Sequence, residues 1–191
     1  MIAKQNKEYY TYADYITWPD EPRCELIDGK IYLMASPSTL HQRVSGRLFR
    51  KFGNYLDGKK CEVFHAPYDV RLNWDKGDDA VVQPDLLVIC DPDKIDGKGC
   101  KGAPDLVVEI LSPSTAKHDM MKKFTKYTDA GVKEIWFADY DEQTILVYRK
   151  NNGGYAFDKY RISDKITVGI LPELTIDMKD IFDSESNETG Q

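Results

Sequence analysis

Residues 81–111 constrain the fold of this 191-residue chain more than any other stretch. The sequence there is VVQPDLLVICDPDKIDGKGCKGAPDLVVEIL, in which two apolar runs, 86–90 and 106–111, flank a loop rich in Gly, Asp and Lys. This pattern predicts two buried strands joined by an exposed connection. The core of the protein is therefore expected to form around this pair of strands.

Each run carries one carboxylate that does not suit a buried strand, Asp85 at the start of the first and Glu109 inside the second. Burying an ionised side chain costs several kcal/mol, roughly, unless a positive group meets it. If the strands pair antiparallel about Gly97, the two residues fall opposite each other, roughly 4.5 to 5.5 Å apart at Cα. The two carboxylates could then share one divalent cation.

A second Pro-Asp pair, Pro104-Asp105, lies close to Glu109 in the sequence. On an extended strand, Asp105 would lie about 13 Å from Glu109, at roughly 3.3 Å per residue. That distance is too long for the two side chains to share an ion, so Asp85 is the better partner.

The composition, 41% apolar and 30% charged, is that of an ordinary globular protein. A chain of this length can bury a core without disulfides or metal ions. We expect a single domain over residues 1–182 and a flexible polar tail over 183–191.

The four cysteines show no C-x-x-C spacing, which argues against a zinc site and a disulfide framework; they are Cys24, Cys61, Cys90 and Cys100. The N-terminus has no apolar segment typical of a signal peptide. No apolar run approaches the roughly 20 residues that a membrane helix requires. We therefore expect a cytoplasmic protein with reduced thiols and no membrane partner.

The net charge of −6 argues mildly against nucleic-acid binding, because nucleic-acid-binding proteins usually carry a basic patch. Net charge does not describe how the charges are distributed. Carboxylates that bind metal ions add negative charge, which the bound cations offset.

Apolar periodicity divides the chain into short elements. We expect helices at 9–18, from the Ser36-Pro37-Ser38 cap to about Leu56, and at 116–130, capped by Ser114 or Thr115 and ended by Gly131. We expect strands at 61–72, 86–90, 106–111 and 135–139, hairpins at 23–34 and 144–161, an edge strand at 165–168, and a strand with a turn at 171–182. This order predicts an α/β sandwich with a central mixed β-sheet flanked by helices, with added hairpins.

Three kinds of side chain on these elements have an ordinary structural interpretation. Glu25, on the first hairpin strand, is most simply a solvent-facing residue. His41 lies in the apolar stripe of its helix, where a lone histidine is more often a hydrogen-bonded core residue than a ligand. Arg43, Arg47 and Arg50 share another face of that helix; such a stripe is more often solvated, but it is the best candidate for phosphate contacts.

The helix expected at 116–130 carries three neighbouring lysines, Lys122, Lys123 and Lys126. At about 100° per residue, Lys122 and Lys126 point away from the apolar face and Lys123 lies beside it. Only Lys123 could reach over the sheet toward the carboxylates. A lysine that merely covers the edge of a packed helix is the ordinary alternative.

Several motifs of the chain resemble one known family. They are ELIDGKIYLM, SPSTLH, QPDLLVI, GAPDLVVEILSPSTAKHD and GVKEIWFAD. Lys123 and Tyr127, four residues apart, precede the last motif. Together they are similar to the putative restriction endonuclease family of the PD-(D/E)XK nuclease superfamily, over about 12–182. The resemblance implies a restriction endonuclease-like α/β fold.

The resemblance also implies roles for particular residues. Asp85 matches the motif aspartate and Glu109 the motif acidic residue, and Glu25 is similar to a glutamate that completes the acidic cluster. Leu111 stands where the superfamily usually has lysine; in this family the lysine looks to have moved to the next helix, where Lys123 matches it. His41 matches a recurrent histidine of unassigned role.

The implied activity is that of a DNA endonuclease that hydrolyses phosphodiester bonds with Mg²⁺, for which Mn²⁺ can substitute. Asp85, Glu109 and Lys123 would be catalytic, and Asp85, Glu109 and Glu25 would bind the metal. Nucleases that cut both strands often pair, so the protein could form a homodimer.

Two other classes of function fit the sequence. The first is a catalytically inactive nuclease-fold module that binds nucleic acid or protein, which the acidic pI and the missing motif lysine favour. The second is a small acidic scaffold that dimerises through its tyrosine-rich hairpins.

Overall fold

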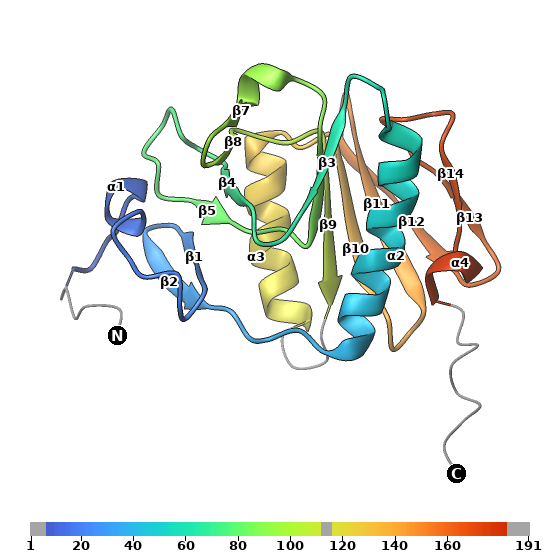
Figure 1. Ribbon diagram of the computed structural model, residues 1–191, viewed down its shortest axis with the longest axis horizontal. Coiled ribbons are helices and arrows are strands. Elements are labelled where there is room, and N and C mark those ends of the chain that lie inside the picture. Colours follow the sequence, from blue (N-terminus) through green and yellow to red (C-terminus); the bar gives the residue numbers. More distant parts are fainter. Residues whose placement is uncertain (1–6, 112–115, 183–191) are drawn as a thin grey trace, which may run out of the picture.

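The computed structural model describes residues 7–111 and 116–182, and Figure 1 shows their arrangement. The helical segments are α1 (Tyr12–Tyr15), α2 (Thr39–Leu56), the 3-10 turn η1 (Pro92–Lys94), α3 (Ala116–Ala130) and α4 (Lys179–Phe182). The strands are β1 (Cys24–Ile27), β2 (Lys30–Leu33), β3 (Glu62–His65), β4 (Asp69–Arg71), β5 (Val81–Val82), β6 (Leu86–Ile89), β7 (Ile95–Asp96), β8 (Gly99–Lys101), β9 (Leu106–Leu111), β10 (Glu134–Asp139), β11 (Thr144–Asn151), β12 (Gly154–Arg161), β13 (Lys165–Thr167) and β14 (Thr175–Asp177).

A mixed sheet, here called the central sheet, has the strand order β12-β11-β10-β9-β6-β3. β9 and β10 pair in parallel, and the other neighbours pair antiparallel. Parallel neighbours need a crossover connection, which α3 supplies between β9 and β10.

Helices α2 and α3 lie on opposite faces of the central sheet (Figure 1). Val108 of β9 packs in the same core cluster as Phe52 of α2. Its neighbour Val107 packs in a second cluster with Tyr127 of α3. Because successive side chains of a strand point to opposite faces, Glu109 belongs to the α3 face.

A second sheet, here called the lateral sheet, has the strand order β2-β1-β5-β4-β8-β7. Ile27 and Val70 from this sheet join the cluster that contains Tyr127, so the lateral sheet packs on the α3 side. The β13–β14 pair packs on the α2 side, where Ile166 and Ile176 belong to the other cluster. The fold is thus the predicted α/β class, a central mixed sheet flanked by helices with added hairpins.

The two long helices begin and end largely as predicted. Ser38 is the N-cap of α2, and its Oγ accepts a hydrogen bond from the N–H of His41 at 3.2 Å. α3 ends before Gly131, whose φ of 88° suits glycine. The predicted caps Ser114 and Thr115, and the predicted tail at 183–191, lie outside the described residues. No helix in the described ranges is long and apolar enough to cross a membrane.

Two expectations about strands are wrong. The stretch 61–72 forms two strands, β3 in the central sheet and β4 in the lateral sheet. Pro67 lies between them, and proline has no N–H to donate to a strand ladder. The connection 91–105, expected to be an exposed loop, contains η1 and the paired strands β7 and β8, and its Cys100 is buried.

The expectation that all cysteines are reduced thiols is also wrong. Cys61 and Cys90 form a disulfide, and the other two cysteines are free and buried. In the β3–β6 register Glu62 lies opposite Ile89, so the next pair along the ladder is Cys61 and Cys90. Their 29-residue separation in sequence concealed this pairing, because it depends on how two distant strands align.

Candidate active site

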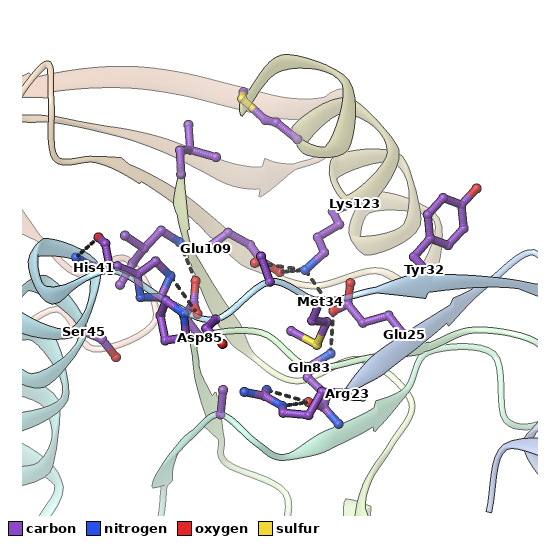
Figure 2. Close-up of a pocket in the computed structure, with 18 of the residues that line it drawn as sticks. Arg23, Glu25, Tyr32, Met34, His41, Ser45, Gln83, Asp85, Glu109 and Lys123 are labelled. Atoms are coloured by element: carbon purple, nitrogen blue, oxygen red, sulfur yellow. Dashed lines mark hydrogen bonds and ion pairs between the residues drawn. The ribbon is translucent and has the colours of Figure 1, made fainter. Parts of the chain in front are cut away.

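A cleft of about 520 Å³ lies where the β1–β2 hairpin, the start of α2, the start of β6, the end of β9 and α3 meet. Figure 2 shows 18 of the residues that line it. Five residues singled out in the sequence are among them: Glu25, His41, Asp85, Glu109 and Lys123. Tertiary folding therefore brings together acidic and basic groups from five separate elements.

Asp85 and Glu109 meet as the strand pattern predicts. β6 and β9 pair antiparallel with Leu86 opposite Val108, and the same register continued by one residue places Asp85 opposite Glu109. Asp85 Oδ2 also accepts a hydrogen bond from the N–H of Ile110 at 2.7 Å. The predicted antiparallel pairing about Gly97 is therefore confirmed.

The Lys123 ammonium links two of the carboxylates. Its Nζ lies 3.1 Å from both carboxylate oxygens of Glu109 and 2.9 Å from Oε1 of Glu25. Glu25 is therefore a buried member of the site and not the solvent-facing hairpin residue that its strand position suggested. The β1–β2 hairpin packs against α3, and this contact could not be read from the alternation of the strand alone.

Lys122 and Lys126 do not reach the carboxylates. Lys122 lies over the ring of Tyr32, and Lys126 forms an ion pair with Asp28. Both partners belong to the β1–β2 hairpin, so these lysines hold the hairpin beside α3. The helical period thus correctly separated Lys123 from its neighbours, but it did not reveal that the neighbours also have partners.

Tyr127 is a further residue of the site. Its fully buried hydroxyl donates a hydrogen bond to Oε1 of Glu109. Tyr127 lies one helical turn after Lys123, so the two side chains share a face of α3. That spacing was the available signal, and only the structure shows which partner the hydroxyl chooses.

The charges of the cluster shift its pKa values. Burial raises the pKa of Glu109 to about 7, with Asp85 and Glu25 adding to the rise and Lys123 opposing it. Burial lowers the pKa of Lys123, but the carboxylates of Glu109 and Glu25 raise it by more, so Lys123 stays protonated. Burial is therefore the main cause of the raised pKa of Glu109, whereas the surrounding carboxylates are the cause of the raised pKa of Lys123.

His41 joins the site from the first turn of α2. Its Nε2 lies 3.2 Å from Oδ1 of Asp85, and its Nδ1 is buried without a hydrogen-bond partner among the described residues. Burial lowers the pKa of His41, but the hydrogen bond and charge of Asp85, with the charge of Glu109, raise it overall. His41 is thus a partner of the carboxylate pair and not a core residue alone.

The arginine stripe of α2 lies outside the cleft. Arg43 and Arg50 are exposed, whereas Arg47 is half-buried and donates from Nη1 to the carbonyl of Ile181 at 2.9 Å. Arg47 therefore holds α4 against α2. A nucleic-acid contact by these arginines stays a prediction.

Two further cleft residues were missed in the sequence. Gln83 donates its backbone N–H to Oε1 of Glu25 at 2.8 Å, and its side chain accepts hydrogen bonds from Arg23. Their positions, two residues before Asp85 and two before Glu25, were the only local signal. Asp105, by contrast, accepts from the N–H of Cys90 and pairs with Lys133 away from the cleft.

The site contains the type of ligand that a hard cation prefers, but the side chains as placed do not form a complete set of ligands. Carboxylate oxygens are the ligands that Mg²⁺ prefers, and Asp85 and Glu109 supply them side by side. Within the described residues, however, no three His, Cys, Asp or Glu side chains are gathered so as to hold an ion. Lys123 lies between Glu25 and Glu109, so recruiting Glu25 as a ligand requires the ammonium to move.

The sequence has relatives among known proteins. Residues 12–179 match the model of the Uma2 family, described as "Putative restriction endonuclease". Two uncharacterized proteins of Synechocystis sp. are similar: slr1290 is 31% identical over 157 residues, 80% of this chain and 81% of that protein, and sll1609 is 28% identical over 131 residues, 66% of this chain and 72% of that protein.

A solved structure also shares the fold. It is the crystal structure of a putative nuclease belonging to DUF820 from Anabaena variabilis, with a TM-score of 0.74 and 22% sequence identity. The likeness covers 90% of this chain and 97% of that one. Since the family model spans most of the sequence, this chain belongs to the Uma2 family of putative restriction endonucleases.

Proposed function

We propose that the protein is a metal-dependent DNA endonuclease that hydrolyses phosphodiester bonds. The observation that carries the proposal is the convergence of Asp85, Glu109 and Lys123 in one cleft. Two opposed carboxylates and a buried ammonium combine hard oxygen donors with a fixed positive charge. The family description supports nuclease chemistry.

Asp85 and Glu109, joined by Glu25 when Lys123 moves, would hold one or two Mg²⁺ ions, and Mn²⁺ could substitute. When bound, the cation supplies an acidified water and a counter-charge for the scissile phosphate. Two hydrogen bonds fix the two carboxylates: Asp85 accepts one from the N–H of Ile110 on β9, and Glu109 accepts one from the hydroxyl of Tyr127 on α3.

Lys123 would orient the attacking water or offset the charge that develops on the phosphate. The carboxylates around it keep its ammonium protonated, so it can donate hydrogen bonds both before and after it moves away from Glu25. His41 keeps the Asp85 side chain in place from the opposite wall of the cleft.

Nicking of supercoiled plasmid DNA with Mg²⁺ or Mn²⁺ tests the proposal. We expect Glu109→Gln and Lys123→Ala to lose activity by about 100-fold or more, the effect of removing one charge-stabilising group from an active site. Glu62→Gln, which changes an exposed carboxylate of β3 outside the cleft, should keep wild-type activity. Equal activity in all variants would reject these assignments.

One observation favours a second candidate, a catalytically inactive nuclease-fold module that binds nucleic acid or protein. Both oxygens of Asp85 already have partners, His41 and Ile110, and the Lys123 ammonium binds Glu109 and Glu25. A cluster whose charged groups already pair with one another needs no metal ion to balance them. Calorimetry separates the two, because a nuclease site should bind Mn²⁺ in the wild type and lose that binding in Glu109→Gln.

A further inference from the structure

Arg23 lies in the wall of the cleft, two residues before Glu25 (Figure 2). Its carbonyl accepts a hydrogen bond from the N–H of Met34 at 2.9 Å, one step beyond the Cys24–Leu33 pair of the β1–β2 ladder. Residues two apart on a strand face the same side, and Arg23 and Glu25 both line the cleft. A paired strand therefore positions this guanidinium beside the acidic cluster.

The partner of Arg23 is a neutral amide. Nε and Nη2 of Arg23 lie 3.2 and 2.7 Å from Oε1 of Gln83. Gln83 is itself fixed, because its side-chain amide donates to Asp69 at 2.9 Å and to the hydroxyl of Tyr15 at 3.2 Å. An amide oxygen orients the guanidinium without cancelling its positive charge.

The bonds to Gln83 leave Arg23 suited to bind an anion. They use two of the five N–H groups and occupy the Nε edge, so the terminal Nη1–Nη2 edge is the one that can donate to two oxygens of a phosphate. Arg23 and Glu25 are about 6.6 Å apart along the strand, at roughly 3.3 Å per residue. This spacing is comparable with that of neighbouring phosphates along one DNA strand.

We propose that Arg23 binds the substrate phosphate next to the scissile one. The inference rests on the proposed nuclease function and adds a binding residue inside the cleft, where the arginines of α2 do not reach. Gln83 is the positioning residue of this contact, because it holds Arg23 through its side chain and Glu25 through its backbone. The β1–β2 hairpin would thus align the DNA strand with the carboxylates.

DNA binding measured without turnover tests the contact. Fluorescence anisotropy of a labelled DNA, used both as a duplex and as a single strand, in EDTA and over a series of salt concentrations, would compare the wild type with Arg23→Gln and Arg23→Lys. The control is Lys150→Gln, which removes one positive charge from an exposed position at the far end of β11, outside the cleft. Thermal unfolding of each variant checks that it is folded.

We expect Arg23→Gln to bind about tenfold more weakly, and the slope of log K against log salt to become shallower by about 0.9. Arg23→Lys should fall in between, because lysine keeps the charge and loses the two-pronged geometry. Lys150→Gln should match the wild type. If Arg23→Gln does not fold, the loss of DNA affinity in Arg23→Lys is the measurement that decides whether Arg23 contacts the phosphate.

Two results would overturn the inference in distinguishable ways. If the wild type binds DNA and the Arg23 variants bind equally well with the same salt slope, Arg23 is not a phosphate contact and the nuclease proposal stands. If the folded wild type binds neither duplex nor single-stranded DNA, the proposed function fails and the phosphate contact fails with it.

Discussion

Glu109 is a buried carboxylate among other carboxylates, with little positive charge to balance them. Burial raises its pKa most, Lys123 lowers it, and Asp85 and Glu25 raise it further. The hydroxyl of Tyr127 opposes the rise through its hydrogen bond. The ionised form of Glu109 therefore lowers the stability of the folded protein, and such perturbed groups are frequent at functional sites.

This effect predicts a pH dependence of folding stability. The pKa of Glu109 is about 7 in the folded protein against an ordinary value of 4.5, so folding favours its protonated form. The wild type should therefore lose stability relative to Glu109→Gln as pH rises from about 4.5 to about 7. We expect a relative loss on the order of 3 kcal/mol in the free energy of unfolding.

Urea unfolding of both proteins over this pH range, without divalent cations, measures the difference. A difference that stays constant, or that grows in favour of the wild type with rising pH, would show that the folded protein does not disfavour ionised Glu109.

Asp105 is a second buried carboxylate, and its contacts indicate a structural role outside the cleft. It accepts a hydrogen bond from Cys90 N–H at 2.7 Å and pairs with Lys133 at 2.6 Å. Asp105→Asn should lower the free energy of unfolding by about 1–3 kcal/mol and leave plasmid nicking by the folded protein intact. Asp85→Asn should abolish nicking. Loss of nicking in folded Asp105→Asn would contradict this division.

At the scale of elements, α3 acts as a clamp for the β1–β2 hairpin. Its lysines contact Tyr32 and Asp28 on the hairpin, while Lys123 reaches Glu25 on the same hairpin and Glu109 on β9. One helix therefore fixes the distance between two sheets. The site depends on this docking, because Glu25 belongs to one sheet and Glu109 to the other.

α2 supplies the other wall, and its first turn carries His41. The Oγ of Ser38 accepts a hydrogen bond from the N–H of His41 at 3.2 Å. Ser38→Ala should therefore lower the free energy of unfolding by about 1 kcal/mol, the usual effect of losing an N-cap. The control is Ser36→Ala, an exposed serine before the cap, which should leave stability unchanged in urea unfolding. Equal stability of both variants and the wild type would show that the cap contributes nothing.

At the scale of the whole molecule, two apolar clusters sandwich the central sheet. One joins α2, α4 and the β13–β14 pair, and the other joins α3 and the lateral sheet. The Cys61–Cys90 disulfide links β3, at the edge of the central sheet, to its neighbour β6. The carboxylate cluster lies at the end of the sheet where these layers meet.

The Cys61–Cys90 disulfide predicts how many cysteines react as free thiols. Unfolded in guanidinium without reductant, the chain should show two reactive thiols, and with prior reduction it should show all four cysteines. In the folded protein the free thiols should react slowly, because burial raises the pKa of Cys24 and raises that of Cys100 to about 12. Four reactive thiols without reductant would show that the disulfide does not form.

Local periodicity predicted the elements that carry the site. The two apolar runs around Gly97 place Asp85 and Glu109 opposite each other because antiparallel register follows from distance to the turn. The helical period separated Lys123 from Lys122 and Lys126 for a similar reason. In both cases the relevant geometry is internal to one hairpin or one helix.

Contacts between elements could not be predicted from local patterns in the sequence. The burial of Glu25, the Gln83 bridge to Arg23 and the Cys61–Cys90 pair all depend on which strands become neighbours. Strand alternation gives the face on which a side chain lies, but not what covers that face.

The sequence by itself thus determined the α/β pattern, the opposed carboxylates and the lysine that meets them, because each follows from spacing along a few dozen residues. Only the tertiary structure decided that the β1–β2 hairpin closes over this pair and brings Glu25 and Arg23 with it. The physical reason is that docking between sheets depends on the packing of whole apolar faces, which no short segment encodes.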